Sequence, residues 1–205
     1  LVFSSNLMLM FCFWEITSVC SWRLIGFYRK EKDLKSADKA FLVTFFGASL
    51  MLAGIIMIFL NYGTLNIPVL RGLPIANLSA FLILCGVIAK SAQLPLQTWL
   101  PDAGVAPTPV TSLLHAAVLV KIGIYVFARI FCSTVIATTF FFNWVIALSV
   151  VTILVASGCA FIENNMKRIL AYSTISQLGY IMFCLALNTG FSLKIALLYI
   201  LAHSL

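Results

Sequence analysis

The sequence predicts an all-α polytopic membrane protein, folded as a bundle of transmembrane helices with one discontinuous helix. Hydrophobic residues make up 62% of the 205 residues and charged residues only 9%, whereas soluble domains usually carry about 25% charged residues. The mean hydropathy is +1.10. Long apolar runs such as residues 41–60 do not alternate between polar and apolar positions, which excludes the strand pattern of a β-barrel.

The apolar runs are long enough to be spanning helices, which need about 20 mostly apolar residues each. They lie near residues 1–28, 40–61, 76–98, 110–131, 139–161 and 169–188, and a seventh begins at about 192. The chain begins at Leu1 without a Met and ends within the seventh run. We therefore expect residues 1–205 to be a fragment of a larger subunit, with about six full spans and a truncated seventh.

The orientation follows from the Lys and Arg residues between the spans. Seven of these cations lie on one side, in the segment 28–39 and at 167–168, and three lie on the other, at Arg71, Arg129 and Lys194. The positive-inside rule places the richer side in the cytoplasm or an equivalent compartment. This distribution also accounts for the net charge of +7 without a nucleic-acid partner.

The third span contains a lysine beside a helix-breaking residue. Lys90 is followed by Ser91, Gln93 and Pro95. Pro95 has no N–H and clashes with the carbonyl of Ser91 in a regular helix. We therefore expect the helix to break beside Lys90, as in transporters whose ion sites lie at discontinuous helices.

Further ionisable residues lie within the predicted spans, where a charge is costly. Arg23 lies eight positions after Glu15, about 80° around a helix, and is expected to extend to the cytoplasmic interface. Glu15 then needs a partner from another helix. The remaining candidates for an ion path are Glu15, Lys90, His115, Lys121 and His203. His115 and Lys121 would lie about 9 Å apart in height along one helix.

The sequence shows no pattern for bond-making chemistry. It has no nucleophile–base arrangement, phosphate-binding loop, metal-ligand spacing or dinucleotide fingerprint. The six cysteines lack a CxxC spacing and are expected to be apolar packing residues. We therefore expect no catalytic residue, cofactor or metal, and a role in moving protons or cations.

Three blocks of sequence resemble the antiporter-like subunits of the complex I superfamily. They are FWEITSVCSWRLIGFYR, AKSAQLPLQTWLPDAGVAPTPVTSLLHAAVLVKIGIYVFAR and MKRILAYSTISQLGY. That superfamily includes the membrane subunits of NADH:quinone oxidoreductase, the Mrp-type Na+/H+ antiporters and the membrane-bound hydrogenases. The resemblance implies that this fragment is the central part of one proton-translocating membrane domain.

The resemblance also implies roles for particular residues. Glu15 matches the family's glutamate that pairs with a lysine on the discontinuous helix, and Lys90 matches that lysine. His115 and Lys121 match polar positions of the next helix, and His203 matches a histidine of a later one. We expect Glu15 and Lys90 to lie within salt-bridge reach or to be joined through one water.

The branch of the superfamily is less clearly marked. Lys121 resembles the Mrp antiporter and hydrogenase branch, as do Phe45 and Ala48 where the dehydrogenase branch carries Arg and Asp. The segment KSAQLPLQTWL instead resembles the chain 5 type of NADH:quinone oxidoreductase. We favour the Mrp or hydrogenase branch, with a chain 5-type proton pump as the alternative and a non-transporting scaffold subunit as the second alternative.

The expected partners are the other membrane subunits of such an assembly, the lipid bilayer, and protons or Na+. The expected location is a bacterial or archaeal plasma membrane or an organellar inner membrane.

Overall fold

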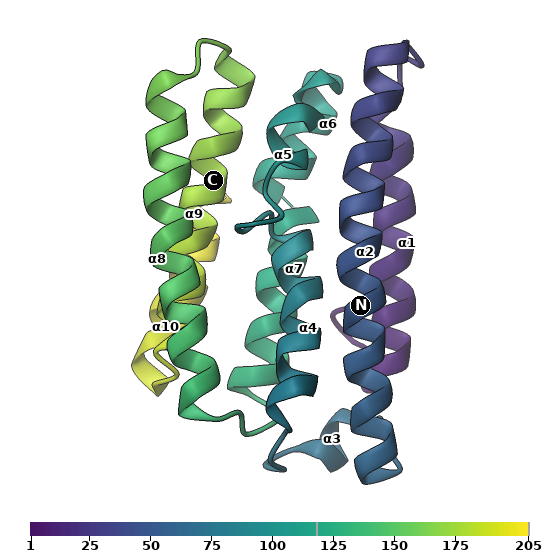
Figure 1. The fold of residues 1–205 in the computed structure, drawn as a ribbon, viewed down its shortest axis with the longest axis vertical. Helices are drawn as coiled ribbons and strands as arrows, with labels where there is room; N and C mark the ends of the chain where they lie inside the picture. The colour runs from purple at the N-terminus through teal and green to yellow at the C-terminus, as the bar shows by residue number, and fades with distance from the viewer. Residues whose placement is uncertain (118, 205) are drawn as a thin grey trace.

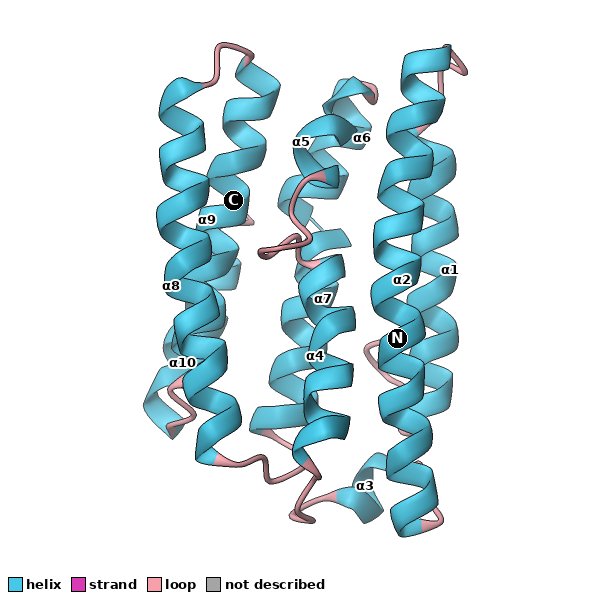
Figure 2. Ribbon diagram, in the orientation of Figure 1, coloured by secondary structure: helices cyan, strands magenta, loops and turns pink. Residues whose placement is uncertain are grey.

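The computed structural model describes residues 1–117 and 119–204 and confirms the all-α prediction. Within these residues the backbone forms helices, loops and two isolated bridges, Asn6 with Asn66 and Pro74 with Ile136, but no strand (Figure 2). All six cysteines lie within the described residues and are free thiols.

Among the described residues, five stretches are long and apolar enough to cross a membrane. They are α1 (Leu7–Ile25), α2 (Glu31–Tyr62), the stretch Thr108–Cys132, α8 (Thr139–Ile162) and α9 (Met166–Ala186). The shorter apolar helices are α4 (Asn77–Lys90) and α10 (Gly190–Ala202). Since α4 and α10 are shorter than a full span, six full spans and a truncated seventh remain a prediction.

The charged segment after α1 is helical, whereas the sequence predicted a loop there. The helix α2 begins at Glu31, well before the predicted span 40–61. Glu31 and Asp33 lie in its first turn, where negative charge offsets the positive end of the helix dipole. Lys35 pairs with Glu31 one turn away, with 2.7 Å between Nζ and Oε1. The helix therefore extends beyond the apolar run.

The helices pack in three adjacent groups, which Figure 1 shows side by side. The first is α1 with α2, the second is α4 with α7 (Leu119–Phe127), and the third is α8 and α9 with α10. The contact between α2 and α4 is close because Gly47 faces Ala89: a Cβ on Gly47 would lie 2.3 Å from the Cβ of Ala89. Small residues allow such close approach of membrane helices.

The helix break predicted beside Lys90 is present. The helix α4 ends at Lys90, and Ala92 has a left-handed backbone with φ of 50°. The chain then runs without helix to the single turn α5 (Trp99–Asp102), and the Leu94–Pro95 peptide bond is cis. This connection lies within the bundle rather than at its end (Figure 2). Another single turn, α3 (Ile67–Leu70), follows α2.

The predicted span 110–131 is a chain of short helical pieces. It comprises α6 (Thr108–Ser112), a π-helical turn η2 (Leu113–Ala117), α7 and a second π-helical turn η3 (Ala128–Cys132). A short 3₁₀ turn η1 (Ala103–Val105) precedes it. Residue 118 of this predicted span lies outside the described residues. His115 is in the η2 turn, so a functional candidate lies where the helix is irregular.

Candidate functional site

Lys90 is completely buried at the carboxyl end of α4, with 0% of its surface exposed. Its Nζ donates to the Ser18 hydroxyl at 2.7 Å and lies 3.5 Å from the carbonyl oxygen of Trp14. The ammonium also lies 5.4 Å from the centre of the Trp14 ring. The carboxyl end of a helix carries partial negative charge. The site therefore accommodates a buried cation with neutral oxygens, an aromatic face and a helix terminus.

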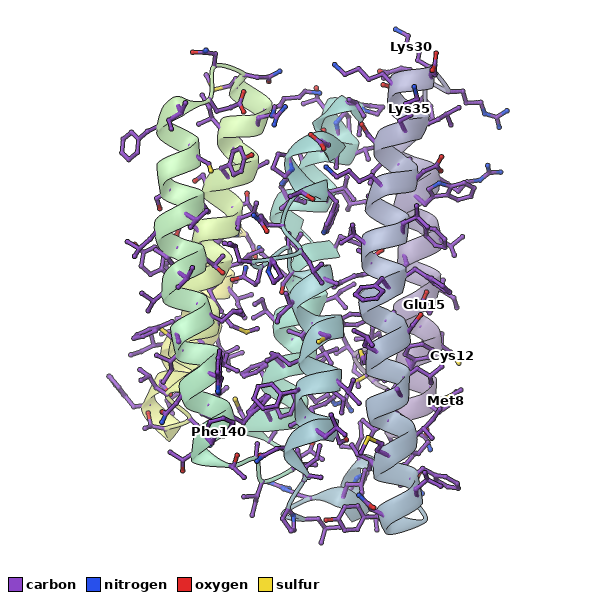
Figure 3. All side chains as sticks on the ribbon, viewed as in Figure 1. Met8, Cys12, Glu15, Lys30, Lys35 and Phe140 are labelled. Carbon is purple, nitrogen blue, oxygen red and sulfur yellow. The ribbon has the colours of Figure 1, made fainter. Side chains whose placement is uncertain are left out.

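Glu15 lies on the same helix as Ser18 but makes no direct ion pair with Lys90 among the described residues. The two groups are not in direct salt-bridge contact, since the Ser18 hydroxyl and the Trp14 carbonyl lie at the ammonium. The alternative that was also expected, a link through one water, stays a prediction. The Glu15 carboxylate is still close enough to Lys90 for the two opposite charges to attract each other. Its Oε1 atom is buried without a hydrogen-bond partner. Figure 3 shows Glu15 on α1, well away from the end that carries Lys30 and Lys35.

Several hydrogen bonds satisfy backbone groups that the break in the helix exposes. The indole N–H of Trp99 donates to the carbonyl of Ala89 at 2.9 Å. The backbone N–H of Gln93 donates to the carbonyl of Ile88 at 3.0 Å. The Gln93 side chain donates to the carbonyls of Ser91 and Ile175, at 3.1 and 3.4 Å. Since buried carbonyls without partners are costly, these bonds stabilise a non-helical backbone inside the protein.

The second group of candidates comprises His115, Lys121 and His203, from η2, α7 and the end of α10. His115 and Lys121 are both only 7% exposed. Neither ring nitrogen of His115 has a hydrogen-bond partner, and Nδ1 of His203 also lacks one. His203 lies close enough to His115, and Lys121 close enough to His203, for the charges of each pair to interact. The Lys121 ammonium donates to the hydroxyl of Ser204 at 2.6 Å.

A cavity of about 320 Å³ lies beside the two histidines. Its lining includes five hydroxyl side chains, those of Thr108, Thr111, Ser112, Ser173 and Thr174, and also Leu170 and Lys167. Ser112 and Thr174 donate their hydroxyl protons to backbone carbonyls one turn back, at 3.1 and 2.9 Å. Their oxygen lone pairs are therefore left to accept hydrogen bonds from water. Thr108 and His115 are separated by about 10 Å of rise.

Lys167 of the cavity lining is followed in the chain by Arg168, which belongs to a network of charges between helices. Lys39 of α2 pairs with Asp102 of α5, with 2.6 Å between Nζ and Oδ2. Arg168 of α9 pairs with Glu163 at 3.0 Å and lies 3.9 Å from Asp102. The Lys167 ammonium donates to the carbonyls of Gly104 and Ala106, at 3.1 and 2.9 Å. Asp102, Lys167 and Arg168 therefore connect separate helical segments.

The structure thus brings the predicted residues together in two groups rather than one. Glu15 and Lys90 are close in space, as are His115, Lys121 and His203, and no hydrogen bond among described residues joins Lys90 to His115. Ser18 was missed, although a serine three residues after a glutamate in an apolar run is a signal for a polar helix face. The Trp14 carbonyl gives no signal in a sequence.

Fold and site together define a class: multi-pass membrane proteins whose ionisable groups are buried beside a broken helix. The comparisons identify the family within that class. Residues 4–205 match the family described as NADH:quinone oxidoreductase/Mrp antiporter, transmembrane. The chain belongs to this family and is an integral membrane protein.

Curated relatives include subunits of quinone oxidoreductases and of a Na+/H+ antiporter. The chain is 41% identical over 214 residues to NADH-quinone oxidoreductase subunit L of Pseudomonas aeruginosa, covering 100% of this chain and 34% of that protein. It is 41% identical over 197 residues to Na+/H+ antiporter subunit A1 of Staphylococcus saprophyticus, covering 92% of this chain and 24% of that protein. The chain therefore spans about a third or less of the length of these relatives.

Solved structures show the same fold. The chain is similar to a chain of the Mrp complex from a Dietzia species, with a TM-score of 0.89, 32% identity, and coverage of 98% of this chain and 23% of that one. It is also similar to a chain of the membrane-bound sulfane sulfur reductase, an archaeal respiratory membrane complex. There the TM-score is 0.85, the identity is 26%, and coverage is 98% of this chain and 43% of the other.

Proposed function

We propose that this chain is the central part of an ion-translocating, antiporter-like subunit, and that Lys90 exchanges a proton during transport. The observation that carries the proposal is the environment of Lys90: it is fully buried, it ends a broken helix, and its direct partners are the Ser18 hydroxyl and the Trp14 carbonyl rather than a carboxylate. A buried lysine without a direct ion pair can change its protonation state at lower cost than a paired one.

The Ser18 hydroxyl suits both protonation states of Lys90. A hydroxyl accepts a hydrogen bond from an ammonium and can donate one to a neutral amine. The Trp14 carbonyl can only accept. Glu15 supplies a nearby negative charge that favours the ammonium without fixing it in an ion pair. A movement of this carboxylate towards or away from Lys90 would therefore change the proton affinity of the lysine.

The cavity beside His115 supports a route from the cytoplasmic side. It extends from Thr108 and Lys167, near the basic end of the bundle, to His115 and His203. Water held by the hydroxyl side chains would connect that end to the imidazoles, whose ring nitrogens can accept or donate a proton. Water would also have to join His115 and Lys121 to Lys90, and the proposal includes this link.

Protons suit this path better than Na+. Hard cations prefer several oxygen ligands, and carboxylates in particular. The described lining of the cavity contains hydroxyls, two imidazoles and an ammonium, but no carboxylate. An imidazole nitrogen binds a proton readily and is a poor ligand for a hard cation.

The chain's relatives are named as subunits of several kinds of complex, and we propose that this chain also functions with other membrane subunits. Lys121 favours an Mrp- or hydrogenase-like assembly. Its burial and its bond to Ser204 support a place for it in the path. A chain 5-type proton pump of NADH:quinone oxidoreductase is the second candidate, favoured by the 41% identity to the Pseudomonas subunit.

The test is proton flux into vesicles that contain the purified complex with the full-length subunit. Lys90→Met should abolish most of the flux while the complex remains assembled. Lys30→Met is the matched control, because Lys30 is exposed and lies beyond the end of α1, and it should leave the flux unchanged. Flux at the wild-type level from assembled Lys90→Met would support the scaffold alternative and overturn the proposal.

A further inference from the structure

A second cavity lies at the carboxyl end of α1, on the side that the Lys and Arg distribution places in the cytoplasm, and it plays no part in the proposed ion path. It has a volume of about 430 Å³ and is lined by Trp22, Arg23, Phe27 and Arg29 together with residues of α2. Arg23 is in the last turn of α1, and Arg29 is in the connection to α2. Two guanidinium groups and two aromatic rings therefore border one open cavity.

The local backbone fixes both arginines at this cavity. The helix α1 ends at Ile25, and the N–H of the capping residue Gly26 donates to the Trp22 carbonyl at 3.1 Å. A Cβ on Gly26 would lie 3.4 Å from that of Ala37, so the end of α1 packs closely on α2. Arg29 has a left-handed backbone with φ of 53°, which is uncommon for a residue other than glycine. The chain thus turns sharply, and the turn sets Arg29 beside Arg23.

Neither arginine is neutralised by the protein. Among the described residues, no ion pair with a carboxylate involves Arg23 or Arg29. The Arg23 guanidinium lies 5.4 Å from the Trp22 ring centre. Trp22 itself is held by a hydrogen bond from its indole N–H to Asp38, at 2.8 Å. The cavity therefore has an aromatic wall anchored by a hydrogen bond and two positive charges that, among the described residues, have no carboxylate partner.

The height of the cavity matches the headgroup region of a membrane. Glu15 is near the middle of α1, and Arg23 lies eight residues further on, about 12 Å of helix rise. Half of a bilayer's hydrocarbon core is about 15 Å thick, so Arg23 would lie near the edge of that core. Phe27 and Tyr28 beside it are exposed, as expected for aromatic residues at an interface. The surface of α1 below Arg23 exposes Phe13, Ile16 and Val19, which suits contact with an acyl chain.

We propose that this cavity binds the headgroup of an anionic phospholipid, with its phosphate held between Arg23 and Arg29 and its acyl chains along α1. Guanidinium groups hold phosphate oxygens with paired, charge-assisted hydrogen bonds. Basic pockets between membrane helices on the cytoplasmic side are suited to anionic lipids. The bound lipid would cover the outer face of the helix that carries Ser18 and Glu15.

The experiment uses the full-length subunit in its complex, in phosphatidylcholine vesicles containing a photoactivatable phosphatidylglycerol. After illumination, mass spectrometry should find the lipid on peptides that contain residues 22–37. Arg23→Gln with Arg29→Gln should reduce this labelling, with about a fivefold loss for each arginine removed. Lys30→Gln is the matched control, since Lys30 does not line the cavity. It should change the labelling by less than about twofold.

Competition identifies the ligand. Unlabelled phosphatidylglycerol should suppress the labelling, whereas phosphatidylcholine and soluble glycerol phosphate should not. The proposal is overturned if the double variant labels like the wild type, or if phosphatidylcholine competes equally. It is also overturned if glycerol phosphate alone displaces the probe, which would indicate a site for free phosphate. Absence of any label on these peptides in the assembled complex would also overturn the proposal.

Discussion

The ammonium of Lys90 donates a hydrogen bond to the Ser18 hydroxyl, with 2.7 Å between Nζ and Oγ, and this bond links the broken helix α4 to α1. Glu15, which the sequence and the family resemblance put forward as the partner of Lys90, lies close by on α1 without a direct ion pair. Ser18 is therefore a component of the site that the structure adds to the predicted residues.

Ser18→Ala should weaken the site without removing the lysine. The ammonium would lose its short hydrogen bond, and bonds to charged groups contribute about 1.5–3 kcal/mol. We expect proton flux per complex to fall by about tenfold or more, since about 1.4 kcal/mol corresponds to a factor of ten. Ser18→Thr keeps a hydroxyl and should retain most of the flux. Ser21→Ala is the control: Ser21 is also buried on α1, but its hydroxyl bonds only the Ser18 carbonyl. Equal effects of both alanine variants would contradict this role.

Trp99→Phe should destabilise the break in α4. The substitution removes the indole N–H that donates to the Ala89 carbonyl at 2.9 Å. A buried carbonyl deprived of its partner costs about 1–3 kcal/mol, and the backbone N–H of Ala92, at 3.4 Å from the same oxygen, compensates only weakly. Thermal unfolding of the purified complex should shift to lower temperature. Trp144→Phe, on an exposed position of α8, should leave the transition where it is, and a matching shift there would refute the assignment.

Gly123→Ala should disturb the contact between α7 and the break. The new Cβ would lie 2.9 Å from the Val87 carbonyl oxygen and 3.1 Å from atoms of Ser91. Backbone atoms cannot easily move aside, so overpacking should cost about 1–3 kcal/mol, again measured as a lower unfolding temperature. Gly158→Ala on α8 is the control, because a Cβ there meets nothing within 4 Å. A stable Gly123→Ala protein would mean that the two helices are not in close contact.

The orientation is tested by cysteine labelling in a chain without its native cysteines. The substitution Lys35→Cys places a cysteine at an exposed position of α2. This cysteine should react with an impermeant reagent only from the cytoplasmic side. A cysteine at Arg71, before Gly72 in the turn after α3, should react only from the other side. Reversed labelling of the two positions would contradict the assignment made from the Lys and Arg distribution.

The sequence predicted the break in the third span because its cause is local. A proline four residues after Ser91 is incompatible with a regular helix wherever it lies in the fold. The buried positions of Lys90, His115 and Lys121 could be predicted for a similar reason, since each lies inside an apolar run. The start of α2 could not, because apolarity marks the membrane-spanning part of a helix, not its charged extension.

The partner of Lys90 could not be predicted from the sequence. Glu15 and Ser18 differ by 60° around α1, and tertiary packing decides which of them turns toward α4. A charge inventory favours the carboxylate, but the hydroxyl is the group in contact. The cavity beside His115 was also inaccessible to sequence reasoning, since Thr111 of α6 and Thr174 of α9 meet there only in the folded chain.

The central claim is that Lys90 exchanges a proton, and Lys90→Arg tests it most directly. Arginine keeps the positive charge and the ability to donate to Ser18, but it stays protonated at any accessible pH. The measurement is proton flux per assembled complex in vesicles, with assembly checked by the subunits that purify together. We predict an assembled complex whose flux is close to background. Wild-type flux from assembled Lys90→Arg would show that a fixed positive charge suffices and would contradict proton exchange at Lys90.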